Sequence, residues 1–207
     1  MANTTLDCNT HILVHMHTNI KQFSWRRFWI LLLPTWFYAG FFYRLMPWRA
    51  LRRVKASATW GSFFALPLLV ALWYFAHTIW IWVGIWAALI VAALFFIPLA
   101  EREIGPTTDP RGRMRTHDQN EIVIDEVLGM FIAVAPTLFI DVFEPARFAW
   151  YLAGAFLLFR FFDIAKVWPA NFFDKESLPA DVIVDDVVAG IYSAIILLVI
   201  LAWEFLF

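Results

Sequence analysis

Long apolar stretches alternate with short polar ones along most of this chain. Residues 59–100 contain no Asp, Glu, Lys or Arg, and these 42 residues are enough for two membrane-spanning helices of about 20 residues each. Polar stretches follow at 101–121 and 169–184, and we expect both to be solvated loops. The pattern predicts four main transmembrane helices, at about residues 60–76, 79–99, 122–140 and 146–166, and a further one at the C-terminus, 185–207.

One further apolar segment, residues 28–43, is short. It has 16 residues, contains a proline and is flanked by arginines on both sides. Because a span needs about 20 apolar residues, we predict an interfacial or re-entrant segment here instead of a spanning helix. The chain is therefore expected to consist of a basic N-terminal extension, residues 1–56, and a membrane domain, residues 57–207.

Composition agrees with a membrane protein. Hydrophobic residues make up 62% of the chain and charged residues 16%, against roughly 45–50% and about 25% in soluble globular proteins. Cys8 is the only cysteine, which excludes an intramolecular disulfide and a cysteine-based zinc site. The sequence therefore predicts an all-α fold, a polytopic helical bundle in a membrane, which offers no element for reading nucleic acid.

Charge is distributed unevenly along the chain. The first 60 residues hold eight basic residues and one acidic residue, whereas the remainder holds eight basic and sixteen acidic residues. The loops predicted on one side of the membrane carry nearly all the nearby Lys and Arg. The positive-inside rule assigns that side to the cytoplasm.

Carboxylates gather at the predicted cytoplasmic ends of three helices. Asp125 and Glu126 begin the third predicted helix, Asp163 lies near the end of the fourth, and Asp185 and Asp186 begin the fifth. In an alternating bundle these three ends meet at one membrane face. Acids at helix N-termini are often ordinary caps, but two adjacent pairs and a fifth acid on the returning helix favour a functional site.

The two acidic pairs have similar surroundings in the sequence. Residues 122–126 and 182–186 share an apolar triplet followed by two acids, and Gly129 and Gly190 follow them. This similarity suggests two halves of one cation site, with the glycines allowing the two helices to approach closely. The cluster contains no His or Cys, and its all-oxygen donors suit Mg²⁺, Mn²⁺ or Ca²⁺.

Basic residues on the fourth predicted helix complete the candidate site. Arg160 and Lys166 suit phosphate oxygens, although an internal ladder of salt bridges with Asp163 is the alternative. Asp174 lies in the loop directly above. These observations indicate a cytoplasm-facing, metal-dependent site for a phosphorylated substrate, and its depth at the membrane boundary favours a lipid.

Three motifs in this region resemble a known family. They are Ile122-Val123-x-Asp125-Glu126-x-x-Gly129-Met130, Phe159-Arg160-x-x-Asp163-x-x-Lys166-x-Trp168-Pro169-x-x-x-Phe173-Asp174 and Asp185-Asp186-x-x-Ala189-Gly190. Together they resemble the bacterial phosphatidylglycerophosphatase A family over about residues 120–200, with weaker similarity over 57–67 at Thr59-Trp60-Gly61-Ser62. The sequence departs from the family's pattern at Ser57-Ala58, at Val167 and at Leu178 to Asp181, which affects the substrate-side loops more than the acidic positions.

The resemblance implies a Mg²⁺-dependent phosphatase of the bacterial inner membrane. Such an enzyme acts on an anionic phospholipid and removes the terminal phosphate of phosphatidylglycerophosphate, giving phosphatidylglycerol. It implies metal-binding and catalytic roles for Asp125, Glu126, Asp163, Asp185 and Asp186. Arg160 and Lys166 would hold phosphate, and Asp174 would support the ligands from outside.

Two alternatives remain open at this point. One is a phosphatase or phosphotransferase that acts on another lipid phosphate, such as a polyprenyl phosphate or diphosphate, or phosphatidic acid. The other is a non-enzymatic ion carrier, which is disfavoured because the acids lie at one membrane face only. The sequence leaves the oligomeric state open, as it does the choice of the carboxylate that accepts a proton.

Overall fold

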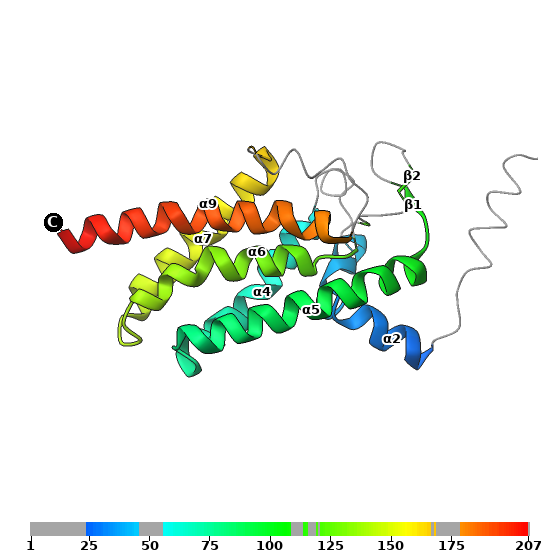
Figure 1. Ribbon diagram of the computed structural model, residues 1–207, viewed down its shortest axis with the longest axis horizontal. Helices are drawn as coiled ribbons and strands as arrows, with labels where there is room; N and C mark the ends of the chain where they lie inside the picture. Colours follow the sequence, from blue (N-terminus) through cyan, green and yellow to red (C-terminus); the bar gives the residue numbers. More distant parts are fainter. Residues whose placement is uncertain are drawn as a thin grey trace, which may run out of the picture.

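A computed structural model describes residues 24–45, 56–108, 114–115, 119, 121–166, 168 and 179–206. The described helices are α2 (Trp25–Leu32), α4 (Ala56–Phe75), α5 (Ile79–Ile104), α6 (Ile124–Val134), α7 (Pro145–Ala165) and α9 (Pro179–Leu206), with 3-10 helices η1 (Ala39–Leu45) and η2 (Ala135–Phe139). Two short strands, β1 (Thr107–Thr108) and β2 (Met114–Arg115), pair antiparallel. The predicted helical bundle is confirmed (Figure 1).

Four helices are long and apolar enough to cross a membrane. These segments are Ser57–Phe75, Ile79–Ile104, Pro145–Ala165 and Ile183–Leu206. Their outer faces carry large exposed hydrophobic side chains, including Phe75 at 91% exposure and Trp80 at 78%. Apolar surface of this extent is rare on a soluble monomer and is expected where lipid surrounds the protein. The chain is therefore an integral membrane protein.

The segment predicted as one helix over 122–140 is divided. Its α-helical part, α6, ends at Val134 after 11 residues, and the chain continues as η2 to Phe139. Pro136 at the start of η2 explains the change, because proline lacks an N–H and its ring clashes with the carbonyl four residues earlier. Ten of the 11 residues of α6 are buried, so α6 forms the centre of the bundle and the longer helices surround it (Figure 1).

Glycines allow α6 and α9 to pack closely side by side. A Cβ atom on Gly190 would collide with the carbonyl of Gly129. A Cβ atom on Gly129 would come within 2.6 Å of the carbonyl oxygen of Asp186 and would also collide with the ring of Phe159. The predicted close approach at Gly129 and Gly190 is thus confirmed, and it brings the first half of α6 beside residues 186–190 of α9.

Contacts at the end of the bundle opposite the first turns of α6, which we call the far end, fix the directions of the helices. The rings of Trp73 and Phe148 stack with centroids 3.9 Å apart, and Trp73 Nε1 donates to the carbonyl of Thr137 at 3.1 Å. Arg147 near the start of α7 contacts Glu204 near the end of α9 at 2.8 Å. The end of α7 therefore lies beside the starts of α6 and α9, as the alternating bundle predicts.

The start of α9 corrects the sequence analysis. We expected the last helix to begin at Asp185 and Asp186, but α9 begins at Pro179. Proline is favourable in the first turn of a helix because its φ is already helical and its missing N–H has no helical partner there. The two acids consequently lie nearly two turns inside the helix, where a capping role no longer explains them.

The N-terminal segment folds against the bundle without crossing it. Helix α2 has only 8 residues, about 12 Å of helix, and η1 has 7, which agrees with the predicted non-spanning segment at 28–43. Between them Trp36, Phe37 and Tyr38 have left-handed φ values of 46°, 54° and 67°. This conformation costs roughly 1–2 kcal/mol for each L-residue, so the surrounding contacts must hold it in place.

Candidate active site

Three carboxylates converge where α6 and α9 lie side by side. Asp125 and Glu126 occupy the first turn of α6, and Asp186 faces them from α9. Their carboxylate oxygens, one from each residue, lie within 4.8 Å of one another. The three residues are at most 8% exposed. We call Asp125, Glu126 and Asp186 the acidic triad.

The acidic triad fits a divalent cation. Buried carboxylates at this spacing repel one another unless a cation or protons intervene. Glu126 Oε2 is buried and has no hydrogen-bond partner in the part of the chain that the structure describes. Opposite ligands of Mg²⁺ lie about 4.2 Å apart, twice the ~2.1 Å bond length, so small side-chain shifts suffice to form one site. The donors are all oxygen, as Mg²⁺ and Ca²⁺ prefer.

Asp163 and Arg160 on α7 lie next to the acidic triad. Arg160 Nη1 contacts Asp163 Oδ2 at 2.6 Å, and both side chains are buried. Both also interact electrostatically with Glu126 and with Asp186. One buried guanidinium therefore faces three buried carboxylates, those of Glu126, Asp163 and Asp186.

Lys166 and Asp185 form the more exposed edge of the site. Lys166 ends α7 with a left-handed φ of 44°, a conformation more usual for glycine at a helix end. Its Nζ contacts Asp185 Oδ2 at 3.0 Å, and the side chains are 23% and 18% exposed. The ion pair links the end of α7 to α9 and keeps an ammonium group at this more exposed edge.

The predicted site residues thus divide into distinct groups. The structure gathers three of the five acids into the triad and pairs the other two, Asp163 and Asp185, with cations. The salt bridge between Arg160 and Asp163 is one step of the ladder considered as the alternative, whereas Lys166 reaches across to Asp185 on α9. Asp174 lies outside the described residues.

The N-terminal segment supports the start of α6, which the sequence analysis did not anticipate. The carbonyl of Pro34 accepts hydrogen bonds from the N–H groups of Val123 at 2.9 Å and Ile124 at 3.1 Å. Gly40 packs on the carbonyl of Glu121 so closely that any Cβ would overlap it. No pattern in the sequence linked residues 34–40 to residues 121–124.

Packing explains why Gly61 is a glycine, and it also accounts for three buried polar residues between α5 and α6. Gly61, within the motif Thr59-Trp60-Gly61-Ser62, has no room for a Cβ, which would lie 2.6 Å from Val123 Cβ. We expected the stretch 101–121 to be a solvated loop, but Glu101, Gln119 and Glu121 are buried, so this prediction is only partly right. Gln119 Nε2 donates to the carbonyl of Gly105 at 2.8 Å and so joins the end of α5 to the approach to α6.

Comparisons with known proteins agree with this geometry. The family model for phosphatidylglycerophosphatase A matches residues 32–201. A Haemophilus influenzae protein named phosphatidylglycerophosphatase A is 36% identical over 151 residues, which are 72% of this chain and 80% of the relative. An Escherichia coli protein of the same name is 38% identical over 85 residues, 41% of this chain and 45% of the relative.

A third relative carries a different name. A Bacteroides thetaiotaomicron protein named "Putative phosphatidylinositol-3-phosphatase" is 30% identical over 147 residues, 70% of this chain and 77% of the relative. No solved structure matches the chain. The family match covers most of the chain and includes every residue of the acidic triad. The chain therefore belongs to the phosphatidylglycerophosphatase A family of lipid phosphate hydrolases.

Proposed function

We propose that this protein hydrolyses the terminal phosphate monoester of phosphatidylglycerophosphate, giving phosphatidylglycerol and inorganic phosphate, in a Mg²⁺-dependent reaction. The observation that carries the proposal is the buried acidic triad beside Arg160, near one end of the helical bundle, in a chain of this family. A phosphate group attached to a lipid lies at the depth of helix ends, whereas the acyl chains lie deeper in the bilayer.

The roles of the residues follow from their surroundings. Asp125, Glu126 and Asp186 would hold Mg²⁺ through carboxylate oxygens. A divalent cation bound there supplies charge that stabilises phosphate oxygens and lowers the pKa of a bound water. Arg160 is the buried cation that can donate to phosphate oxygens, and Lys166 at the more exposed edge attracts the anionic head group.

The hydrolysis requires one proton acceptor from this chain. The oxygen of a water molecule forms a new bond to phosphorus, and the bond between phosphorus and the glycerol oxygen breaks. The water gives up a proton to a carboxylate, for which Asp125 and Asp163 are the candidates, and the glycerol oxygen gains a proton. Asp163 is held by Arg160, so the same arginine would orient both the phosphate and this carboxylate.

The acidic end of the bundle is proposed to face the cytoplasm of a bacterial inner membrane. The support is the excess of Lys and Arg in the loops on that side. Replacing Cys8, the only cysteine, provides a background in which Thr78→Cys marks the far end and Arg102→Cys the acidic end. A membrane-impermeant thiol reagent should label Thr78→Cys in intact cells and Arg102→Cys only after permeabilisation; the reverse pattern contradicts the proposal.

The activity is tested by phosphate release from purified protein in mixed micelles. The substrates are phosphatidylglycerophosphate, phosphatidic acid, a polyprenyl diphosphate and, because of the Bacteroides relative, phosphatidylinositol 3-phosphate, each with Mg²⁺ and with EDTA. Magnesium-dependent release from the first lipid alone is expected. Release from another lipid alone would reassign the substrate, and release that persists in EDTA would refute the metal requirement.

A further inference from the structure

An apolar cavity lies beside the N-terminal turn. Its volume is about 570 Å³, within the range of roughly 300–1,000 Å³ typical of ligand pockets. It lies between the turn with left-handed backbone, the start of η1 and one residue of α4. The lining aromatic residues are Trp36, Phe37, Tyr38, Phe41, Phe42 and Phe64. We call this space the aromatic cavity.

The walls of the aromatic cavity are almost entirely carbon. Trp36 Nε1 donates to the carbonyl of Phe64 at 3.0 Å, and the Tyr38 hydroxyl donates to the carbonyl of Phe28 at 3.1 Å. These bonds use the polar atoms of both rings for backbone contacts. A cavity of this kind suits a hydrocarbon chain and disfavours a phosphate or a sugar, whose polar groups would lose their hydrogen bonds to water.

The aromatic cavity is connected to the acidic triad through the backbone. Its turn begins just after Pro34, whose carbonyl is bonded to Val123 and Ile124, immediately before Asp125. Its other side begins at Gly40, which lies on the carbonyl of Glu121. The turn that lines the cavity is therefore joined directly to the backbone that leads into Asp125 and Glu126.

A second apolar pocket provides a contrast. It has a volume of about 160 Å³ and lies between α5 and the second half of α6, where Ile79, Trp82 and Ala135 are among its lining residues. Ala135 is about two and a half helical turns beyond Glu126 along α6. This pocket is smaller and lies nearer the end of the bundle where α5 begins.

We propose that the aromatic cavity binds an acyl chain of the lipid whose phosphate is hydrolysed at the acidic triad. The inference rests on the proposed function and adds to it a structural basis for selecting a membrane lipid over a soluble phosphate ester. In this proposal the head group binds at the triad and the acyl chain binds in the cavity, as two parts of one site. The acyl chain would not have to pass between the helices of the bundle. The preference for a long chain is thus a property of residues 36–42 and Phe64.

The test compares a long-chain phosphatidylglycerophosphate with a water-soluble form that carries six-carbon chains. Phe37→Asn removes one wall of the cavity, and asparagine tolerates the left-handed φ of 54° at this position. Phe143→Asn is the matched control, since Phe143 is an exposed aromatic residue in the turn at the far end. The measured quantity is the ratio of kcat/KM for the long-chain substrate to that for the short-chain substrate.

The ratio should fall about tenfold in Phe37→Asn, a loss comparable to removing hydrophobic contacts from a substrate pocket, and should keep its wild-type value in Phe143→Asn. An unchanged ratio in Phe37→Asn, or an equal loss for both substrates, would overturn the inference. Ala39→Leu places a larger side chain in the cavity and should also lower the ratio. Ala135→Leu in the second pocket is its control and should leave the ratio unchanged.

A binding measurement separates this inference from the proposed reaction. Phosphatidylglycerol with a photoactivatable acyl chain, incorporated into vesicles with the protein, should crosslink within residues 36–42 or at Phe64. If the wild-type protein hydrolyses neither substrate but crosslinks there, the proposed function fails and the acyl-chain site stands. Crosslinking spread evenly over the outer faces of α5, α7 and α9 would refute the site even in an active enzyme.

Discussion

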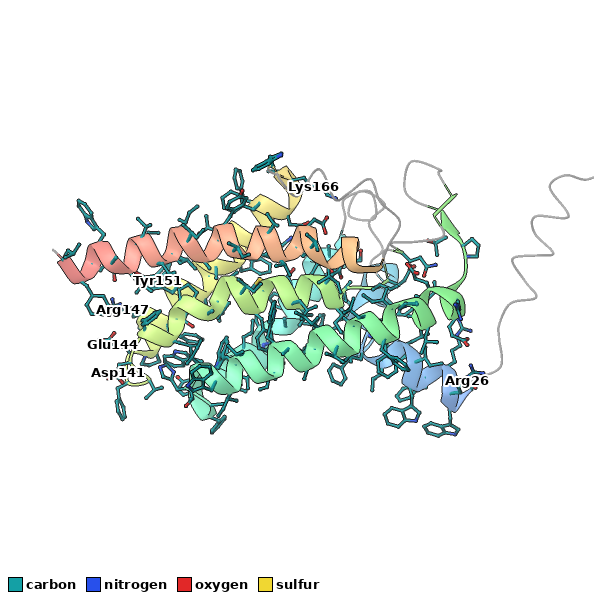
Figure 2. All side chains as sticks on the ribbon, viewed as in Figure 1. Arg26, Asp141, Glu144, Arg147, Tyr151 and Lys166 are labelled. Atoms are coloured by element: carbon teal, nitrogen blue, oxygen red, sulfur yellow. The ribbon has the colours of Figure 1, made fainter. Side chains whose placement is uncertain are left out.

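Charged side chains gather at both ends of the bundle, and the two clusters differ in burial and in balance. At the far end Arg147 contacts Glu144 at 3.0 Å and Glu204 at 2.8 Å, with the side chains 32–47% exposed (Figure 2). At the other end Asp125, Glu126 and Asp186 are at most 8% exposed and acids outnumber bases among the described residues.

The difference separates two uses of charge in a membrane protein. Exposed ion pairs keep most of their hydration and contribute little to stability, so their residues can be substituted with little effect. Buried carboxylates without enough cations destabilise the fold and persist where they serve a ligand. We therefore expect the acidic end to serve the proposed reaction at a cost in stability, whereas the ion pair of Arg147 with Glu204 joins α7 to α9.

The largest expected effect comes from removing one charge from the acidic triad. Asp186→Asn should lower the rate of phosphate release by about 10³-fold or more, because it replaces a metal-binding carboxylate oxygen with a weaker neutral ligand. The melting temperature should stay the same or rise, since repulsion within the triad decreases. Phosphate release and circular dichroism melting in detergent measure the two quantities.

Asp141→Asn is the matched control for this substitution. Asp141 is exposed at the far end, where its Oδ1 accepts a hydrogen bond from the N–H of Phe143 at 3.0 Å, and asparagine can keep that bond. Activity within about twofold of the wild type is expected. Full activity in Asp186→Asn, or an equal loss in both variants, would remove the functional distinction between the two ends.

Exchanging arginine for lysine should affect the two ends differently. Arg160→Lys keeps the charge but loses the planar group that can contact both Asp163 and a phosphate, so kcat/KM should fall by roughly 10–100-fold. Arg147→Lys retains a single flexible ion pair in an exposed position and should leave kcat/KM unchanged. Steady-state kinetics with the long-chain substrate provide the comparison; equal kinetics in the two variants would argue against a phosphate contact by Arg160.

The close approach of α6 and α9 predicts an effect of intermediate size. Gly190→Ala forces a methyl group against the carbonyl of Gly129 and should destabilise the protein by about 1–3 kcal/mol. It should also lower activity, because it separates Asp186 from Asp125 and Glu126. Gly84→Ala on α5 meets no atom within 4 Å and should be neutral or stabilising by up to about 1 kcal/mol.

Unfolding in a denaturing detergent series tests the glycine pair. If Gly190→Ala and Gly84→Ala have the same stability, the contact between α6 and α9 is not tight at this point, and the geometry of the acidic triad would need another support.

The smallest effect is expected for the exposed ion pairs. Arg147→Gln removes both contacts at the far end and should lower the free energy of unfolding by at most about 1 kcal/mol, with activity unchanged. Raising the salt concentration should reduce even that difference, because exposed charges are screened. A loss of activity comparable to that of Asp186→Asn would show that the far end takes part in the reaction.

Much of this architecture could be predicted because a membrane-spanning helix requires a hydrophobic segment of about 20 residues, and such segments can be recognised in the sequence. The run 59–100 predicted α4 and α5, and the polar stretches around it set the alternation that brings the ends of three helices together. The predicted positions of Asp125, Glu126 and Asp163 near their helix ends agree with the structure. Pro136 and Pro179 were the local signals that the length argument overlooked.

Only the tertiary structure decided which carboxylates join the acidic triad and which form ion pairs. It also decided which backbone contacts hold the start of α6 in place. Whether Asp185 contacts Lys166 or joins Asp125 and Glu126 depends on how α9 is rotated against α6 and α7, and Gly129 and Gly190 fix that rotation through contacts between backbones. The bonds from Val123 and Ile124 to Pro34 join residues about 90 positions apart, through backbone atoms that every residue shares. The sequence by itself determined the membrane helices and the chemical types at the site, because hydrophobic length and charge are local properties. Packing selected the acidic triad and formed the aromatic cavity, because both depend on distances between segments that only the folded chain brings together.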